Sequence, residues 1–181
     1  MNTGYIILAV LLGVLVLWLI ALYNSLVRLR NRTKEGWSDI DVQLKRRHDL
    51  IPNLVSSVKG YMKHERGLLE KVTELRSQAL DQQSKGDTKG LAKTESLLGG
   101  MLGQLQIAVE AYPDLKANQN VAQLMDELSD TENKIQAARR FYNGMVRDFN
   151  TKVEQFPNSL VAGMFGFKQF EFFELEDASE R

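Results

Sequence analysis

The pair His64-Glu65 is the part of this sequence that comes nearest to a catalytic metal motif. A zinc protease of the His-Glu-x-x-His class needs a second histidine four positions after the first, because that spacing places both imidazoles on one face of a helix. Position 68 is Leu, and the other histidine, His48, lies in a separate segment. Without cysteine, two separated histidines make a poor zinc site. We therefore interpret His64 as a surface or helix-capping residue.

Carboxylates are the other residues that could hold metal ions. In helical bundles, two-metal centres combine glutamates from two helices with Glu-x-x-His pairs from two others, and no Glu-x-x-His occurs in this chain. We expect the acids to pair with lysines and arginines along helix surfaces instead. Phosphate-binding glycine loops and the Gly-x-Ser-x-Gly elbow are also absent. The sequence therefore predicts a protein that is not an enzyme, with no catalytic residue, metal, cofactor or small-molecule substrate.

A short basic cluster, Lys45, Arg46 and Arg47, precedes His48 and is a candidate interaction surface. Nucleic acid is not an expected partner, because the 23 basic and 23 acidic residues balance and no aromatic residues are interleaved with the cluster. A phosphate, a lipid headgroup or a partner protein would suit the charge. Ordinary solvated helix surface is the simplest interpretation.

The elements that position these residues begin with a membrane anchor. No charged side chain occurs from Met1 to Val27, and a helix of about 20 apolar residues crosses the roughly 30 Å hydrocarbon layer of a bilayer. A cleavable signal sequence would need a basic start and a small-x-small cleavage site, which are missing. A core helix of this length would carry a polar stripe. The anchor residues that we single out are Tyr5, Ile6, Leu12, Trp18, Leu22 and Tyr23.

Basic residues follow the apolar segment directly and predict its orientation. Arg28, Arg30, Arg32 and Lys34 lie just after it, and no basic side chain lies before it. Positively charged flanks stay in the cytoplasm, so we expect the N-terminus outside and the larger domain inside the cell.

Apolar residues recur every three or four positions along most of the remaining chain, which indicates helices. The expected helical segments are 26–44, 54–79, 91–109 and 115–153. Two architectures depend on Pro52. If it only kinks a helix, the chain from Leu26 to Leu80 forms one rod of about 80 Å. If it opens a new helix with Asp49 as the cap, the four segments pack as an antiparallel bundle, which we favour.

Two further segments are candidate interaction surfaces. Gly99 and Gly103 lie inside the third helical pattern, and their spacing allows another backbone to approach closely, either within the bundle or from a second subunit. Residues 159–173 contain five phenylalanines, and we expect Gly163 and Gly166 to prevent a helix there. This segment either covers the bundle as an extended strap or contacts another subunit or the membrane. Its phenylalanines are Phe165, Phe167, Phe170, Phe172 and Phe173.

Several blocks of the sequence resemble the LemA family. They are Trp37-Ser-Asp-Ile-Asp-Val-Gln-Leu-Lys-Arg-Arg47, Asp49-Leu-Ile-Pro-Asn-Leu-Val55, Phe141-Tyr-Asn143 and Phe156-Pro157. Gly36 and His48 depart from the pattern, where Ala and Tyr are expected. The resemblance implies a bacterial inner-membrane protein with a helical-bundle cytoplasmic domain and no established reaction. It also implies a scaffolding or membrane-organising role, because relatives are linked with membrane-associated assemblies, one branch with magnetosomes.

We therefore predict an all-α protein. Residues 1–27 form a single transmembrane helix, residues 28–156 an antiparallel four-helix bundle with long helices, and residues 157–181 an extended strap and acidic tail. The predicted function is a self-associating scaffold whose partners are the membrane, further copies and other membrane proteins. Two alternatives stay open: a regulatory subunit of a membrane protease or transporter, and a metal-dependent enzyme.

Overall fold

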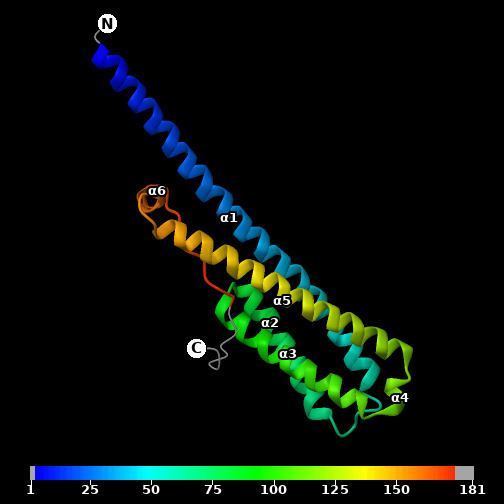
Figure 1. Ribbon diagram of the computed structural model, residues 1–181. Helices are drawn as coiled ribbons and strands as arrows, with labels where there is room; N and C mark the ends of the chain where they lie inside the picture. The colour runs from blue at the N-terminus through cyan, green and yellow to red at the C-terminus, as the bar shows by residue number, and fades with distance from the viewer. Residues whose placement is uncertain (1–2, 174–181) are drawn as a thin grey trace. The chain divides into compact units, whose positions relative to one another are not determined.

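The computed structural model describes residues 3–173, and every regular element in that range is a helix, which confirms the all-α prediction. Figure 1 shows the elements in chain order from blue to red. They are α1 (Thr3–Val58), α2 (Arg66–Lys85), α3 (Thr88–Glu110), α4 (Pro113–Lys116), α5 (Gln119–Glu154) and α6 (Asn158–Met164).

The chain divides into two compact units. The first contains residues 1–37 and 141–172, and the second contains residues 38–140 and 173–181. The long helices α1 and α5 therefore contribute residues to both units. The predicted boundaries at residues 27 and 156, which follow the end of the uncharged segment and the end of the last helical pattern, stay a prediction.

The first unit has a small aromatic core. Leu26 of α1 and Phe149 of α5 are fully buried, together with Val161, Ala162 and Phe167 of the C-terminal segment. A close contact in this core accounts for glycine at position 36, because a Cβ atom there would lie only 3.2 Å from Cδ1 of Phe141 on α5. Glycine in place of the expected alanine therefore lets α1 and α5 approach closely.

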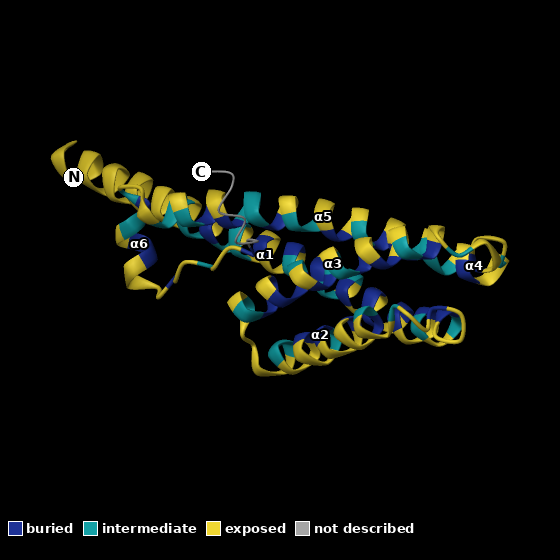
Figure 2. Cartoon of the chain, turned by 90° about the horizontal axis from the view of Figure 1, so that it is seen from below, coloured by how far each residue is buried: buried dark blue, intermediate teal, exposed yellow. Residues whose placement is uncertain are grey.

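The second unit has a larger core, drawn from α1, α2, α3, α4 and α5. The apolar periodicity of the sequence recovers it, because buried core residues recur at three- and four-residue intervals along α1, α2 and α3. Figure 2 shows these buried faces in dark blue along the helices. Antiparallel packing as a four-helix bundle stays a prediction. The core residues are Ile51, Leu54, Val58, Met62, Leu69, Val72, Leu75, Leu98, Leu102, Leu105, Val109, Leu115, Val121 and Leu128.

The favoured prediction that Pro52 opens a helix is wrong. Pro52 lies inside α1, which ends at Val58, and the chain reverses through residues 59–65. Proline has no N–H group to donate to the carbonyl of His48 four residues earlier. Nε of Arg76 on α2 donates to that carbonyl instead, at 2.6 Å. A neighbouring helix thus supplies the hydrogen bond that the proline removes, and α1 continues.

The expectation that Gly163 prevents a helix is also wrong. Gly163 lies within α6, which ends where Gly166 takes a φ of 68° and the N–H of Phe167 donates to the carbonyl of Ala162 at 2.9 Å. A seven-residue helix tolerates one interior glycine because the cost is only about 1 kcal/mol. The extended part of the segment is therefore shorter than expected, residues 167–173.

This extended segment is held against α5 by its backbone. The side-chain amide of Asn150 donates to the carbonyl of Phe170 at 2.9 Å and accepts from the N–H of the same residue at 2.9 Å. The hydroxyl of Tyr142 donates to the carbonyl of Glu171 at 2.9 Å. Burial, and then the negative charge of Glu171, raise the pKa of this phenol to about 12, so it stays a donor at physiological pH.

The pairing of Arg76 with the His48 carbonyl can be tested with a double-mutant cycle. We expect Arg76→Met to lower the free energy of unfolding by about 1–3 kcal/mol, because it leaves a partly buried carbonyl without a donor. In a Pro52→Ala background the same change should cost clearly less, since alanine restores the N–H within α1. Denaturant unfolding followed by circular dichroism measures both values. The control is Arg66→Met on the exposed surface of α2, and equal costs of Arg76→Met in the two backgrounds would disprove the compensation.

Candidate membrane-anchoring and interaction surfaces

The first 19 described residues of α1 form an uncovered apolar surface. Every residue from Thr3 to Ala21 is exposed, and over the described residues α1 is the helix long and apolar enough to cross a membrane. Of the predicted anchor residues, Tyr5, Ile6, Leu12 and Trp18 are exposed as a lipid-facing surface requires. Within residues 3–173, none of the most apolar window of this surface is buried, so no described part of the chain covers it.

Leu22 and Tyr23 differ from the other predicted anchor residues, because protein covers part of each. Both pack against the core of the first unit. The ring centroid of Tyr23 lies 4.7 Å from that of Phe165 and 5.8 Å from that of Phe167. The apolar segment therefore changes from exposed to protein-covered between Ala21 and Leu22.

The basic flank follows this change. Arg28, Arg32 and Lys34 are exposed. Arg30 is half-buried, and its guanidinium carbon lies 5.1 Å from the ring centroid of Phe167 in a cation–π contact. Three of the four predicted charges are thus available to a surface, and the fourth helps to hold the C-terminal segment.

The basic cluster of α1 does not form one surface, which corrects the prediction. Lys45 and Arg46 are exposed, but Arg47 is fully buried. The guanidinium of Arg47 pairs with the carboxylates of Glu95 on α3 and Glu132 on α5 and donates to the Glu95 carbonyl at 3.2 Å. Arg47 is therefore a structural residue, because a buried arginine must be neutralised by partners of its own protein.

Glu95 is the centre of this buried ion cluster. Its second carboxylate oxygen, Oε1, lies 2.7 Å from Nε2 of His48, which is also buried. Burial acts to raise the pKa of Glu95, but the hydrogen bond from His48 and the positive charge of Arg47 outweigh it and hold the pKa below its ordinary value. The departure from the family pattern at position 48 therefore has a role, because histidine reaches this carboxylate.

Sequence analysis missed this cluster, although one signal was present. Glu95 lies four residues after Leu91 and three before Leu98, both buried, so it sits at a core position of α3. A charged residue in an apolar stripe predicts a buried counter-charge on a neighbouring helix. The identity of that partner depends on how the helices pack, which a single sequence does not reveal.

The two glycines of α3 have different surroundings. A Cβ atom at Gly99 would lie 3.3 Å from Oε1 of Glu132 and 3.5 Å from Nη1 of Arg47, so this glycine makes room for the ion cluster. A cavity of about 280 Å³ lies beside it and is bordered by Phe173. Gly103 is exposed and nothing lies within 4 Å of its Cβ position. Of the two alternatives for this pair, close packing within the protein therefore describes Gly99.

The five phenylalanines of the C-terminal segment also differ in how far they are buried. Phe167 and Phe173 are buried, which corrects their prediction as a contact surface for other molecules, and Phe170 is half-buried. Their burial fills the cores of the units to which they belong. Phe165 and Phe172 remain 60% and 38% exposed and are available for contact.

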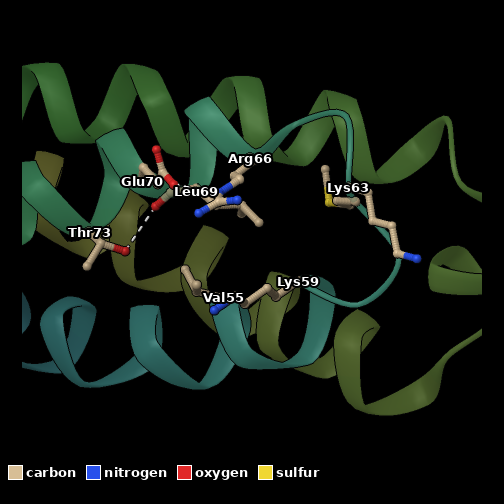
Figure 3. A pocket seen from close by; sticks show the side chains of 8 residues that line it. Val55, Lys59, Lys63, Arg66, Leu69, Glu70 and Thr73 are labelled. Carbon is tan, nitrogen blue, oxygen red and sulfur yellow. Dashed lines mark hydrogen bonds and ion pairs between the residues drawn. The ribbon is translucent and has the colours of Figure 1, made fainter.

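A groove of about 760 Å³ opens between the end of α1 and the start of α2 (Figure 3). Its interior includes the buried side chains of Met62 and Leu69. Three exposed cations border it, Lys59, Lys63 and Arg66, the last paired with a carboxylate at 2.8 Å. Such a groove suits an apolar segment that carries negative charge. Sequence analysis missed it, because the turn was expected at Pro52.

His64 lies in the same turn and is exposed, as predicted. Within residues 3–173, no group of three or more His, Cys, Asp or Glu side chains is arranged to hold a metal ion. In the buried ion cluster the carboxylates of Glu95 and Glu132 pair with Arg47 and His48, so these four side chains satisfy one another rather than forming a metal ligand set.

The chain combines an uncovered apolar helix with helical units, and its sequence matches a known family. The model of the LemA family covers residues 36–181. The chain belongs to the LemA family. Among curated LemA-family relatives, Protein LemA of Metamycoplasma hominis is 32% identical over 139 residues, which cover 77% of this chain and 63% of the relative.

Magnetosome proteins are also similar. MamQ 2 of Paramagnetospirillum magneticum is 25% identical over 181 residues, which cover 87% of this chain and 66% of the relative. MamQ of Magnetospirillum gryphiswaldense is 24% identical with the same coverage. This LemA-family chain thus spans just under two thirds of the length of the curated relatives it matches.

The buried ion cluster makes a stability prediction for this LemA-family chain. We expect Glu95→Gln to lower the free energy of unfolding by about 3 kcal/mol at neutral pH, because it leaves buried Arg47 with one counter-charge fewer. Since the folded state lowers the pKa of Glu95, its contribution is full above the unfolded-state pKa and is lost as the pH falls through the folded-state value. The destabilisation caused by Glu95→Gln should therefore shrink in acid.

Denaturant unfolding of the full chain in mild detergent, at neutral pH and at about pH 3.5, measures both effects. The matched control is Glu70→Gln, whose carboxylate pairs with exposed Arg66 and should contribute less than about 1 kcal/mol. Equal effects of the two substitutions would contradict a stabilising role for the buried cluster.

Proposed function

We propose that this LemA-family chain is a single-pass membrane protein whose helical units act as a non-catalytic interaction module. The observation that carries the proposal is the uncovered apolar start of α1, which leads without a break into helices with cores of their own. An apolar surface of this size is unfavourable in water, so lipid or another protein must cover it. Lipid is the occupant that its length and uniform apolar character favour.

The two curated relatives from magnetotactic bacteria are named as magnetosome proteins. They support a role at a membrane-bound assembly for this chain also. We propose the bacterial inner membrane as the location, with the second unit packed as an antiparallel four-helix bundle in the cytoplasm. Three exposed basic residues after the span, Arg28, Arg32 and Lys34, favour this orientation.

The proposed mode of action is lateral self-association. An anchored module is confined to two dimensions, which raises its effective concentration for weak contacts. The groove between α1 and α2 is the proposed contact, because its cationic border and apolar interior are complementary to acidic apolar segments such as Glu174-Leu-Glu-Asp177 of a second copy. Scaffolding requires no chemistry beyond such contacts.

The orientation predicts a protection pattern. Protease added to intact spheroplasts should leave the second unit whole, because the basic flank holds it in the cytoplasm. Immunoblotting with an antibody against residues 88–110 reads the result, and permeabilised cells provide the control. Digestion in intact spheroplasts would reverse the proposed orientation without removing the anchor.

Self-association predicts the effect of two charge reversals. We expect the detergent-solubilised full chain to be an oligomer by light scattering, and Lys59→Glu with Lys63→Glu to shift it toward the monomer mass. The matched control is Lys93→Glu with Lys116→Glu, which changes the same charge at exposed positions outside the groove. A monomeric parent protein would remove self-association from the proposal, and an equal effect of the control pair would remove the groove from it.

A further inference from the structure

The helix α6 and its two flanks expose large apolar side chains in the first unit. Phe156, Leu160, Met164 and Phe165 are 80%, 61%, 81% and 60% exposed. Single exposed apolar residues are common on protein surfaces, but a group of four on one short element is an interaction site.

One side of α6 carries exposed apolar side chains. Leu160 and Met164 are spaced by four residues and share a face of the helix, while Phe156 and Phe165 flank it. The opposite face is buried, with Val161 4% and Ala162 1% exposed in the core that they share with Leu26 of α1. Both sides of α6 are therefore apolar. One packs against the protein, and the other faces the surroundings.

The position of α6 identifies those surroundings. Its inner face packs where the span ends, against Leu22 and Tyr23, and the Tyr23 ring lies 4.7 Å from that of Phe165. The preceding residue of α1, Ala21, is the last of the exposed apolar series that begins at Thr3. The outer face of α6 is thus continuous with the surface that requires lipid.

We propose that the outer face of α6, formed by Leu160 and Met164, enters the membrane interface beside the end of the span together with the flanking side chains of Phe156 and Phe165. The inference rests on the proposed function, because it requires α1 to cross the bilayer. Interfacial helices bury their apolar face about 5–10 Å into the boundary between headgroups and acyl chains. Exposed Arg28 and Lys168 in the same unit are placed to meet anionic headgroups.

Tethering explains how so short a helix holds this position. A free seven-residue helix would bind lipid weakly, since binding strength follows the apolar area that is buried. The span already holds α6 at the bilayer, so its contact with lipid is an intramolecular event at high effective concentration. A second copy of the chain would need a matching face, whereas the interface lies next to α6 wherever the span is inserted.

Quenching of tryptophan fluorescence by lipids with brominated acyl chains tests the proposal on the full chain. The chain has two tryptophans, Trp18 in the span and Trp37 beyond it, so single-tryptophan proteins are accessible. Leu160→Trp and Met164→Trp, each combined with Trp18→Phe and Trp37→Phe, report on α6 at two independent exposed positions. The control is Arg147→Trp in the same background, because Arg147 is an exposed residue on α5 of the same unit. The Trp37→Phe protein reports on the span itself through Trp18.

The proteins are reconstituted in phosphatidylcholine–phosphatidylglycerol vesicles with and without bromine. We expect Trp18 and the tryptophans at 160 and 164 to lose fluorescence in brominated vesicles, and the tryptophan at 147 to keep it. Quenching of Trp18 without quenching at 160 and 164 overturns this inference and leaves the anchor in place. Quenching at all positions, including 147, also overturns it, because α6 would then not be distinguished from the rest of the unit. An unquenched Trp18 overturns the anchor itself, and with it the role of α6.

Discussion

A carboxylate buried among apolar helices must be neutralised by its own protein, and this requirement organises the second unit. Removing an ion from water costs several kcal/mol, which only close, well-directed partners offset. Glu95 on α3 has two such partners on α1, Arg47 and His48, and Arg47 extends the network to Glu132 on α5. Three helices therefore have one register in which every charge is paired. A shift of any of these helices would leave a buried charge without its partner, a penalty that apolar contacts alone do not impose.

The two units of this LemA-family chain meet different demands with the same kind of helix. In the second unit the apolar stripes of the helices pack against one another and are buried. In the first unit, α1 presents apolar residues on all sides up to Ala21 and a single buried stripe afterwards. The change is abrupt, and α6 packs at that point with apolar side chains on its outer face. Exposure of this kind is consistent with lipid rather than water around this part of the protein.

Periodicity and composition predicted the helical class, the apolar start of α1, and the ends of α3 and α5, which lie at Glu110 and Glu154 against the expected 109 and 153. These features depend on residues close together in sequence. The errors have a different origin. Pro52 was expected to end a helix because its missing N–H is a local fact, whereas the donor that compensates for it, Arg76, is 24 positions away. The burial of Arg47 has the same cause, because its counter-charges lie on α3 and α5. Local rules failed where a partner from another helix changed the outcome.

The attachment of the C-terminal segment has an evolutionary consequence. Asn150 binds both the N–H and the carbonyl of residue 170, as the edge of a β-strand would, and Tyr142 binds the carbonyl of residue 171. Main-chain groups are common to nearly all amino acids, so these hydrogen bonds do not depend on the side chains of the segment, of which Phe170 adds a ring contact with Phe149 at 5.2 Å. Substitutions at the exposed positions 168, 169 and 172 can therefore accumulate without loss of these main-chain contacts, whereas loss of the Asn150 or Tyr142 side chain removes them.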